Sequence, residues 1–283
     1  MKIAVFPNLT RKNAYAVTMN LVAILKQLDL KFCFPDDLSA LLPDDLTFAP
    51  ESEIFKTVDV IIVVGGDGSM MRTAKSCIGY KIPVLGVNAG NLAYLMNLDA
   101  SELNLLSALK TGNFAIEKRM TADVKVTTPD KKVIYSDLCI NDIIVARGKN
   151  INPTRLRVFC DGKIVGEYNA DGIVVSTPTG STAYNLSAKG PIVDPALETI
   201  IVTPVSPHSL TARPIIFSSA SVIEIENPAD NERETVFSCD GEDSIAVPCG
   251  SIITVKKAAA KTRFIRIKDD SFIETLYKKL SEI

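Results

Sequence analysis

The chain has 283 residues, with 31 Lys and Arg, 33 Asp and Glu and one His, and its formal net charge is −2. Hydrophobic residues make up 47% and charged residues 23%, which is typical of a globular protein and excludes disordered, collagenous and coiled-coil chains. The near-neutral charge gives no reason to expect a nucleic-acid partner. No apolar run approaches the ~18 residues of a membrane span, and the N-terminal apolar stretch is too short for a signal peptide. We therefore expect a cytoplasmic protein with no membrane partner.

Cysteine and histidine usage narrows the chemistry. Six cysteines without a CxxC pair predict reduced, mostly buried thiols rather than a disulfide framework or a zinc site. The single histidine, His208, excludes a metal site with two His ligands, and no Gly-x-Ser-x-Gly motif accompanies it. We expect His208 to be structural and assign no residue as a metal ligand. Catalysis would then depend on carboxylates, main-chain amides, cations and metal.

The first 118 residues alternate between strand and helix patterns. We expect strands at residues 2–6, 58–64 and 83–87, and helices at 12–28, 69–77 and 101–110. Ser101 is the expected N-cap of the last helix, and Gly112 follows its end. The region containing Pro35, Pro43 and Pro50 shows no regular pattern. This alternation predicts an α/β domain with a mainly parallel sheet.

From residue 119 to 256 the pattern is β-rich. Short β-branched runs occur at residues 122–128, 132–138, 143–145, 156–160, 163–168, 173–175, 221–226 and 251–255. Asp161-Gly162 predicts a hairpin, and residues 182–189 predict one helical insertion. We therefore expect an α/β domain at 1–118 and an all-β domain at 119–256. Residues 257–283, which include an amphipathic helix at 272–280, are expected to pack back on the first domain.

One motif follows the buried strand at 58–64. Its residues are Gly65, Gly66, Asp67, Gly68 and Ser69, and a helix pattern begins there. Glycines permit positive φ and close approach of a phosphate, and a helix N-terminus offers unpaired N–H groups. The alternative is a tight turn with Asp67 as N-cap. The chain lacks both the G-x-G-x-x-G and the G-x-x-x-x-G-K-[ST] motifs.

A second motif spans residues 171–191 and contains DGIVVSTPTGSTAYNLSAKGP. Its hydroxyl-rich loop suits hydrogen bonding to a polar ligand, and Tyr184 suits stacking on a planar ring. A solvated Ser/Thr turn before a capped helix explains the same residues. Asn141-Asp142 suits ribose hydroxyls or an Asx turn. Asn88 lies in a further strand-end loop at residues 86–92.

Together these motifs resemble the NAD kinase family. The GGDG turn, the Asn-x-Gly loop, the Asn-Asp pair, the STPTGSTAY block and the PHSL-x-ARP segment at 207–214 follow the family order from residue 63 to about 243. The resemblance implies a phosphofructokinase- or diacylglycerol-kinase-like α/β domain and a β-rich NAD-binding domain. It also implies transfer of the γ-phosphoryl of ATP to the 2′-hydroxyl of the adenosine ribose of NAD, giving NADP.

The resemblance also implies roles for individual residues. Asp67 is the expected general base. Asn152 and Asn169 stand where the family often has a basic residue, Glu242 where an amide is common, and Ala93-Tyr94 where Gly-Phe is usual. Phosphate and ATP contacts are expected at Gly65, Gly66, Gly68 and Ser69. The expected NAD-binding residues are Asp67, Gly68, Arg72, Asn88, Asn141, Asp142, Asn152, Asn169, Asp171, Thr182, Ala183, Tyr184, Asn185, Leu186, Ser187 and Glu242.

The expected partners are NAD and ATP, with a divalent cation, Mg²⁺, on the ATP phosphates. The resemblance further implies a homodimer or homotetramer. Two alternatives stay open: a lipid kinase that shares the GGDG turn, and a non-catalytic NAD-binding sensor. The absence of Trp and of a basic amphipathic helix argues against the first, and the presence of Asp67 argues against the second.

Overall fold

The computed structural model describes residues 1–90, 93–149, 151–209, 211–231, 233–268 and 272–280. Residues 91 and 92 of the Asn88 loop and residue 210 of the 207–214 segment lie outside this part of the chain. Two compact units make up the molecule: Met1–Lys118 with Lys261–Ile283, and Arg119–Ala260. Two long strands, β7 (Ala115–Thr127) and β18 (Ile252–Arg266), carry the chain from one unit into the other.

The first unit is built on a parallel sheet in the order β18-β5-β4-β1-β2-β3, with β6 pairing β5. Its other strands are β1 (Lys2–Pro7), β2 (Lys31–Pro35), β3 (Phe48–Ala49), β4 (Val60–Gly65), β5 (Val84–Asn88) and β6 (Leu98–Asp99). Every residue of β4 is buried, as expected for a central strand of a parallel sheet covered on both faces. The α/β class predicted for this region is confirmed.

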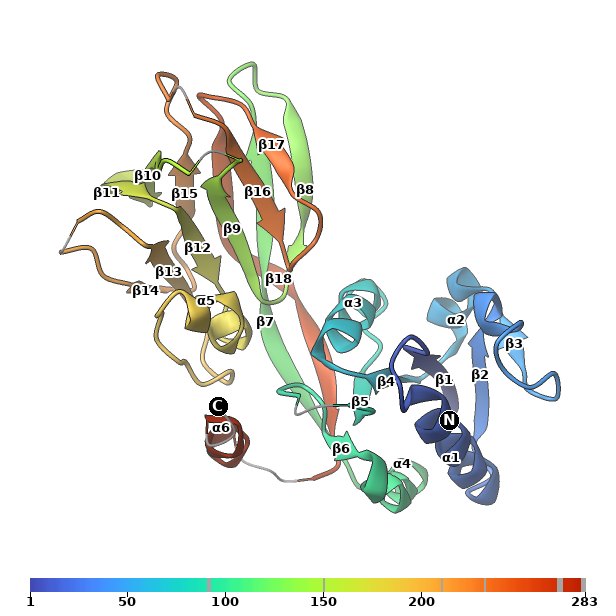
Figure 1. The fold of residues 1–283 in the computed structure, drawn as a ribbon. Coiled ribbons are helices and arrows are strands. Elements are labelled where there is room, and N and C mark those ends of the chain that lie inside the picture. The colour runs from blue at the N-terminus through green and yellow to red at the C-terminus, as the bar shows by residue number, and fades with distance from the viewer. Residues whose placement is uncertain (91–92, 150, 210, 232, 269–271, 281–283) are drawn as a thin grey trace. The chain divides into compact units, whose positions relative to one another are not determined.

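Helices cover both faces of this sheet: α1 and α4 lie on one face, and α2 and α3 on the other (Figure 1). The helical elements of the unit are α1 (Ala14–Gln27), η1 (Asp36–Leu38), α2 (Glu51–Thr57), α3 (Asp67–Cys77), η2 (Ala100–Leu106), α4 (Ser107–Thr111) and α6 (Phe272–Leu280). The strand order reverses between β1 and β4. Their carboxyl ends therefore form the switch point where open α/β sheets bind ligands.

Two local expectations for this unit were wrong. Ser101 is not the N-cap of the helical segment that follows β6, because Asp99 is its N-cap and Glu102 completes a capping box with it. The region without a regular pattern contains β2, β3 and α2. Its prolines fall at element ends: Pro35 ends β2, and Pro50 is the N-cap of α2, where the absence of an N–H costs little.

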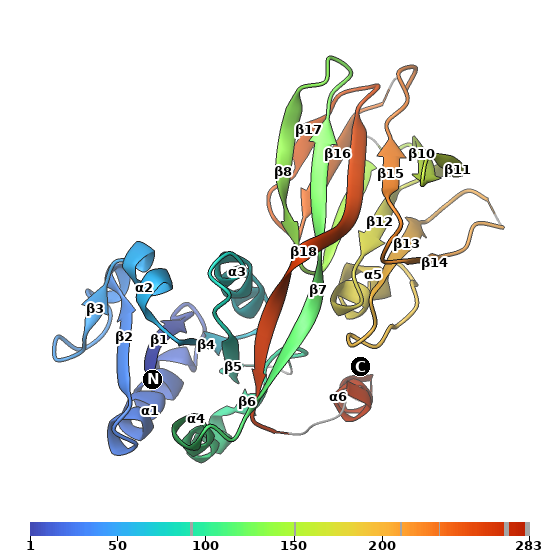
Figure 2. The ribbon, with the colours of Figure 1, turned by 180° about the vertical axis from the view of Figure 1, so that it is seen from behind.

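The second unit consists of two antiparallel sheets that enclose one core. The first has the order β11-β10-β15-β18, with β7 pairing β18 and β8; the second has the order β14-β13-β12-β9-β16-β17. Figure 2 shows β7 beside β18. Val124, Val145 and Val158 are among the buried residues between the sheets. The remaining strands are β8 (Val133–Cys139), β9 (Asp142–Arg147), β10 (Thr154–Cys160), β11 (Lys163–Ala170), β12 (Gly172–Ser176), β13 (Thr199–Val205), β14 (Ile215–Ser218), β15 (Ile223–Glu226), β16 (Thr235–Cys239) and β17 (Ile245–Val247).

The β-rich class predicted for this region is confirmed, with differences in detail. Asp161 and Gly162 have φ values of 52° and 74° and form the predicted hairpin between β10 and β11. The single helix expected at residues 182–189 is instead a 3-10 turn, Thr179–Thr182, followed by the one-turn helix α5, Tyr184–Ser187. No helix in the described part of the chain is long and apolar enough to cross a membrane.

Candidate active site

The glycine turn lies where β4 ends and α3 begins. Gly66 is the N-cap of α3 and has an extended backbone, with φ −140°, and neither Gly65 nor Gly68 has positive φ. These glycines therefore do not adopt the positive φ that glycine permits, and the space beside them is the relevant property. A Cβ on Gly65 would lie 3.0 Å from Ser69 Oγ, whereas a Cβ on Gly68 would meet no atom within 4 Å. The main chain at Gly68 is thus open to a ligand.

Asp67 is the first residue of α3, and its carboxylate is held by another loop. Its Oδ2 accepts the main-chain N–H of Tyr94 at 2.7 Å, and its Oδ1 accepts that of Leu95 at 2.9 Å. The N-cap alternative is therefore wrong, because the carboxylate does not cap its own helix. A carboxylate oxygen has two lone pairs, so it can accept more than one hydrogen bond. The change from Gly-Phe to Ala-Tyr at positions 93–94 preserves these contacts, since any residue but proline supplies the N–H.

Two predicted residues support the walls of this turn. Ser69 Oγ accepts a hydrogen bond from Asn8 Nδ2 at 2.9 Å, which joins α3 to the loop after β1. Asn88 Nδ2 donates to Asp99 Oδ1 at 3.1 Å, and Asn88 Oδ1 accepts the N–H of Gly90 at 3.1 Å. The Asn88 side chain thus orders its own loop, because its Nδ2 and its Oδ1 each make a hydrogen bond within the protein.

Two cations lie close to the turn. Arg72, predicted from sequence, is exposed and lines a cavity together with Ser69 and Asn8. Arg11 was not predicted. Its guanidinium lies against two glycines, because a Cβ on Gly66 would be 3.3 Å from Arg11 Nη2 and a Cβ on Gly90 would be 3.4 Å from Nη1. The sequence signal for Arg11 was weak, because it is a single arginine just after an apolar strand and no motif surrounds it.

In the second unit, Asp240 holds the Asn141–Asp142 loop. The Asp240 carboxylate accepts the N–H of Ile140 at 2.9 Å and that of Asn141 at 2.7 Å, and the Asp240 N–H donates to the carbonyl of Asp142 at 2.9 Å. Sequence reasoning missed Asp240. The Asp240-Gly241 pair, both with positive φ, forms a turn of the same kind as Asp161-Gly162 and was the available signal.

Asp142 begins β9, opposite Ser176 of β12, and is 5% exposed. Its Oδ2 is buried with no hydrogen-bond partner among the described residues. Burial and the nearby charge of Asp240 raise the pKa of Asp142 to about 7, against a smaller lowering by the main-chain N–H of Tyr184. The geometry thus leaves a buried carboxyl oxygen without a hydrogen-bond partner among the described residues.

The STPTGST loop packs directly on this pair. Thr177 N–H and Ser176 Oγ both donate to the carbonyl of Asn141, at 2.9 and 3.2 Å. A Cβ on Gly180 would lie only 2.1 Å from the same carbonyl oxygen. Most of the predicted hydroxyls here, Ser176, Thr177 and Thr179 among them, are buried. The solvated-turn alternative is therefore wrong, and the loop forms a packed floor under Asn141.

The residues after this loop divide into buried and accessible groups. Asn185 is fully buried: its Nδ2 donates to the carbonyls of Ser181 and Pro191, and its Oδ1 accepts from Thr203. Its role is to shape the segment. Tyr184 is 45% exposed and Thr182, Ala183, Leu186 and Ser187 are partly or fully accessible. A cavity of about 360 Å³ lies between Ser187 and the family-like segment that includes Pro207 and Arg213.

The other predicted residues of this unit lie on its surface. Asp171 Oδ1 accepts from Arg147 Nε at 2.6 Å. The carbonyl of Asn169 accepts the N–H of His208, which places His208 beside β11. Glu242 Oε2 accepts from Tyr135 at 3.4 Å. Asn152 and Asn169 are exposed. Each unit thus brings its own share of the predicted residues together: Gly65–Ser69 with Asn88 in the first, and Asn141–Asp142 with the STPTGST loop in the second.

The fit of a divalent cation follows from the available ligands. Among the described residues, one group of three ligand-type side chains has its ligand atoms within 4.8 Å: Cys139, Cys239 and Asp240. Thiols do not suit Mg²⁺, and the Asp240 oxygens already accept main-chain N–H groups. The glycine turn offers the Asp67 carboxylate and the Ser69 hydroxyl. Such a set suits a cation that arrives on a triphosphate and needs few protein ligands.

Comparisons with known proteins agree with this arrangement. Residues 3–111 match the ATP-NAD kinase N-terminal domain, and residues 140–267 match the ATP-NAD kinase C-terminal domain. The chain is 35% identical over 282 residues to the NAD kinase of Caldanaerobacter subterraneus subsp. tengcongensis and 34% identical over 282 residues to that of Thermoanaerobacter pseudethanolicus, with 99% of each chain covered.

Two solved structures share the fold. Yeast NADH kinase complexed with NADH superposes with a TM-score of 0.91 at 23% identity, covering 99% of this chain and 87% of that one. The NAD kinase from Archaeoglobus fulgidus complexed with ATP gives 0.76 at 25% identity, with both chains fully covered.

The glycine turn with its oriented aspartate, at the switch point of a parallel sheet, fits a phosphotransferase of the kinase class, and that is the class of the matched relatives. These relatives are NAD kinases, and they favour neither a lipid kinase nor a non-catalytic sensor. The chain belongs to the ATP-NAD kinase family.

Proposed function

We propose that the chain is an NAD kinase that transfers the γ-phosphoryl group of ATP to the 2′-hydroxyl of the adenosine ribose of NAD, giving NADP. The observation that carries this is the Asp67 carboxylate, which stands at the carboxyl end of a buried strand and is oriented by two N–H donors. Support comes from the 35% identity to a curated NAD kinase across 99% of the chain.

Asp67 acts as the general base. The ribose 2′-oxygen forms a bond to the γ-phosphorus while the bond from that phosphorus to the β,γ-bridging oxygen breaks, and Asp67 accepts the hydroxyl proton. Phosphoryl transfer requires mainly positioning and charge neutralisation, so a chain with one histidine can perform it. The two amides that hold Asp67 supply the positioning.

The phosphates of ATP lie along Gly65, Gly66, Gly68 and Ser69, where the open side of Gly68 admits them. Arg11 neutralises part of their charge. A divalent cation, Mg²⁺, would be carried by the triphosphate and would supply further neutralisation.

Each unit contains residues that we propose as NAD contacts. Asp142 accepts a ribose hydroxyl through its unpartnered Oδ2, and Asn141 supports the same end of the dinucleotide. Asp171, oriented by Arg147, accepts a second polar group. Asn185 shapes the segment rather than contacting NAD through its side chain. The remaining proposed contacts are Gly68, Arg72, Asn88, Asn152, Asn169, Thr182, Ala183, Tyr184, Leu186, Ser187 and Glu242.

A coupled assay tests the reaction and the base. The purified chain is incubated with NAD, ATP and Mg²⁺, and NADP is detected with an NADP-specific dehydrogenase. Asp67→Asn is expected to bind NAD by calorimetry but to lose roughly 10²–10⁴-fold in turnover. Asp29→Asn, at an exposed turn residue of the same unit, is the matched control and keeps full activity. Near-full turnover by Asp67→Asn contradicts the base assignment, and absence of NADP from the wild type contradicts the function.

Three wider assignments belong to the same proposal. The reaction places the chain in NADP biosynthesis, and we expect it to take place in the cytoplasm. We also expect a homodimer or homotetramer, which sedimentation analysis of the purified chain measures directly.

A further inference from the structure

Two buried cysteines and an aspartate meet in the second unit, next to the Asn141–Asp142 loop. Cys139 is the last residue of β8 in one sheet, Cys239 is the last residue of β16 in the other sheet, and Asp240 follows Cys239. The two Sγ atoms and a carboxylate oxygen of Asp240 all lie within 4.8 Å of one another. Neither thiol has a part in the proposed kinase reaction.

The spacing of these atoms matches that around a tetrahedral metal ion. Cys139 Sγ donates to Asp240 Oδ1 at 3.4 Å. A tetrahedral zinc ion, with sulfur at about 2.3 Å and a carboxylate oxygen at about 2.0 Å, holds two such atoms about 3.5 Å apart. An ion can thus take the place of the thiol proton between the same two atoms. The N–H groups of Ile140 and Asn141 need not leave Asp240, because a carboxylate oxygen can have more than one partner.

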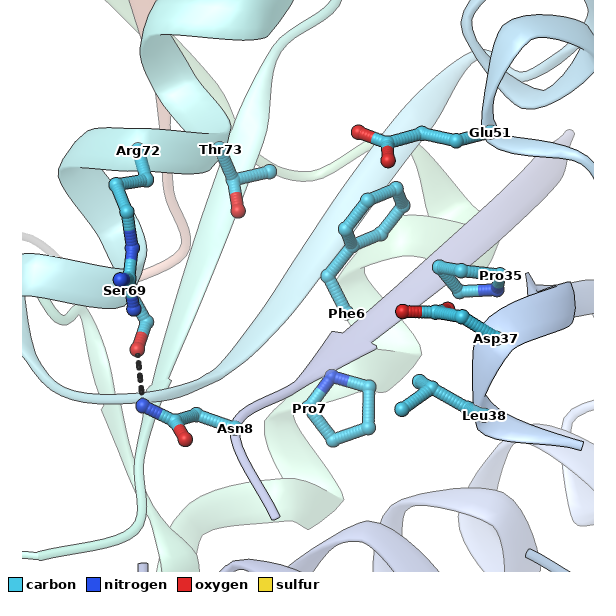
Figure 3. Close-up of a pocket in the computed structure, with 10 residues that line it drawn as sticks. All are labelled: Phe6, Pro7, Asn8, Pro35, Asp37, Leu38, Glu51, Ser69, Arg72 and Thr73. Carbon is cyan, nitrogen blue, oxygen red and sulfur yellow. Dashed lines mark hydrogen bonds between the residues drawn. The ribbon is translucent and has the colours of Figure 1, made fainter. Parts of the chain in front are cut away.

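The pair of thiols determines the class of ion. Thiolate sulfur binds Zn²⁺ and similar soft cations in preference to Mg²⁺ or Ca²⁺. The cavity beside the glycine turn differs in this respect. Asp37 and Glu51 lie opposite Arg72 there, and the described residues that line it offer oxygen and nitrogen atoms but no sulfur (Figure 3). The cluster around Cys139 is therefore suited to a thiophilic cation.

Burial of the cluster is compatible with such an ion. Cys139 and Cys239 are 2% and 1% exposed, whereas Asp240 is half-buried and gives access from the surface. Burial raises the pKa of the Cys139 thiol, so an entering ion must displace a proton there. The two charges of the ion balance two thiolates, and the cluster keeps the single negative charge of Asp240. Binding therefore buries no additional net charge.

We propose that Cys139, Cys239 and Asp240 form a structural site for a thiophilic divalent cation, Zn²⁺, with water as the fourth ligand. The ion joins β8 of one sheet to β16 of the other and fixes Asp240, which holds the Asn141–Asp142 loop. The absence of a CxxC pair predicted no zinc site, but the two thiols come from strands far apart in the sequence. The site does not depend on the proposed function.

Cobalt substitution is the first test. Co²⁺ replaces Zn²⁺ in tetrahedral sites and gives a charge-transfer absorption band when thiolate binds it. Titration of the purified, reduced chain is expected to saturate this band at one Co²⁺ per chain, and Zn²⁺ is expected to abolish it. Cys139→Ser and Cys239→Ser should each lower the affinity at least about tenfold, since loss of a group outside the ligand set already costs about 10–100-fold.

Cys249→Ser is the matched control for this titration. Cys249 is an exposed cysteine of the same unit and is not part of the cluster, so its loss should leave the band unchanged. Circular dichroism verifies that each variant folds. An unchanged band in folded Cys139→Ser, or a band lost in Cys249→Ser, overturns the proposal.

The second test uses the wild type alone and so does not depend on the folding of a variant. Zn²⁺ is expected to release about two protons per ion near neutral pH, with an affinity that falls as pH is lowered. X-ray absorption at the zinc edge should show two sulfur neighbours at about 2.3 Å. One equivalent of Zn²⁺ should also raise the melting temperature, because the cluster exists only in the folded chain. A shell of oxygen and nitrogen alone overturns the proposal. Neither test measures kinase activity, so each remains decisive if the proposed function fails.

Discussion

The two units hold their central carboxylates in opposite ways. Asp67 in the first unit accepts two main-chain N–H groups from a neighbouring loop, so its plane is fixed before any ligand binds. Asp142 in the second unit is buried with one oxygen unpartnered among the described residues, close to the negative Asp240. The first arrangement suits a base that must be oriented. The second suits a group whose unfavourable burial is relieved when a ligand supplies a donor.

The contrast between the fully held Asp67 and the incompletely paired Asp142 also occurs within the second unit, as Asp240 shows. It lies beside Asp142, yet its carboxylate accepts the N–H groups of Ile140 and Asn141. The loop therefore satisfies one carboxylate of the pair and leaves the other incompletely paired. Orientation of Asp67 and incomplete pairing of Asp142 should therefore be separable by substitution.

The largest effect is expected from Asp142→Asn, measured as unfolding free energy against pH. Unfolded Asp142 ionises near pH 4, whereas in the folded chain it stays protonated up to about pH 7. The folded state thus binds the extra proton between these values, and the stability of the wild type falls as pH rises from 4 to 7. Relative to Asp142→Asn, we expect a fall of about 4 kcal/mol, complete above pH 7. A constant difference across this range contradicts the incomplete pairing of Asp142.

A loss of orientation without a change in charge is expected from Tyr94→Pro. Proline has no N–H, so Asp67 loses the donor to its Oδ2. We expect kcat to fall about 100-fold, a cost typical of a misplaced reacting group. Tyr94→Phe keeps the N–H and serves as control, with kcat within about twofold. Equal kcat in both variants shows that the main-chain contact does not orient the base.

Gly68→Ala tests whether the free space beside Gly68 is required by a ligand or by the fold. Gly68 is helical and a Cβ there meets nothing within 4 Å, so alanine should raise stability by about 0.5–1 kcal/mol. The same methyl group would occupy the open side proposed for the phosphates and raise the KM for ATP severalfold. Thermal unfolding and initial rates measure the two effects. An unchanged KM places the phosphates elsewhere.

The smallest effect is expected from Arg147→Met. The Arg147–Asp171 ion pair is partly exposed, so its loss should change stability by at most about 1 kcal/mol. If Asp171 contacts NAD, the KM for NAD should rise while that for ATP stays constant. A rise in the KM for both NAD and ATP would show that the Arg147–Asp171 ion pair supports the fold in general rather than NAD binding.

The sequence predicted the elements that carry strong local signals. The β-branched run of β4 and the Asp161-Gly162 hairpin were confirmed, because hydrophobic pattern and turn chemistry act within a few residues. The fold class and the family were also confirmed. The roles assigned to individual site residues stay predictions.

Other features depend on tertiary contacts that no local pattern reveals. The strands β13, β14, β16 and β17 were not predicted, and β13 contains Pro204, which argues against a strand when read locally. Gly180 is required by the carbonyl of Asn141, 39 residues earlier in the chain, rather than by its own turn. The amides that hold Asp67 come from positions 94 and 95, where the side chains carry no signal.

The return of the chain into its first unit bears on when activity can appear during synthesis. Asn97, just beyond the loop that holds Asp67, accepts through Oδ1 the N–H groups of Ile267 and Lys268, and Phe264 pairs with Val84 at the edge of the parallel sheet. These partners leave the ribosome only after residues 119–260 have been made. A nascent chain therefore carries the glycine turn for most of its synthesis without the strand that anchors the loop behind it. We expect the enzyme to become active only after residues 264–268 have been synthesised.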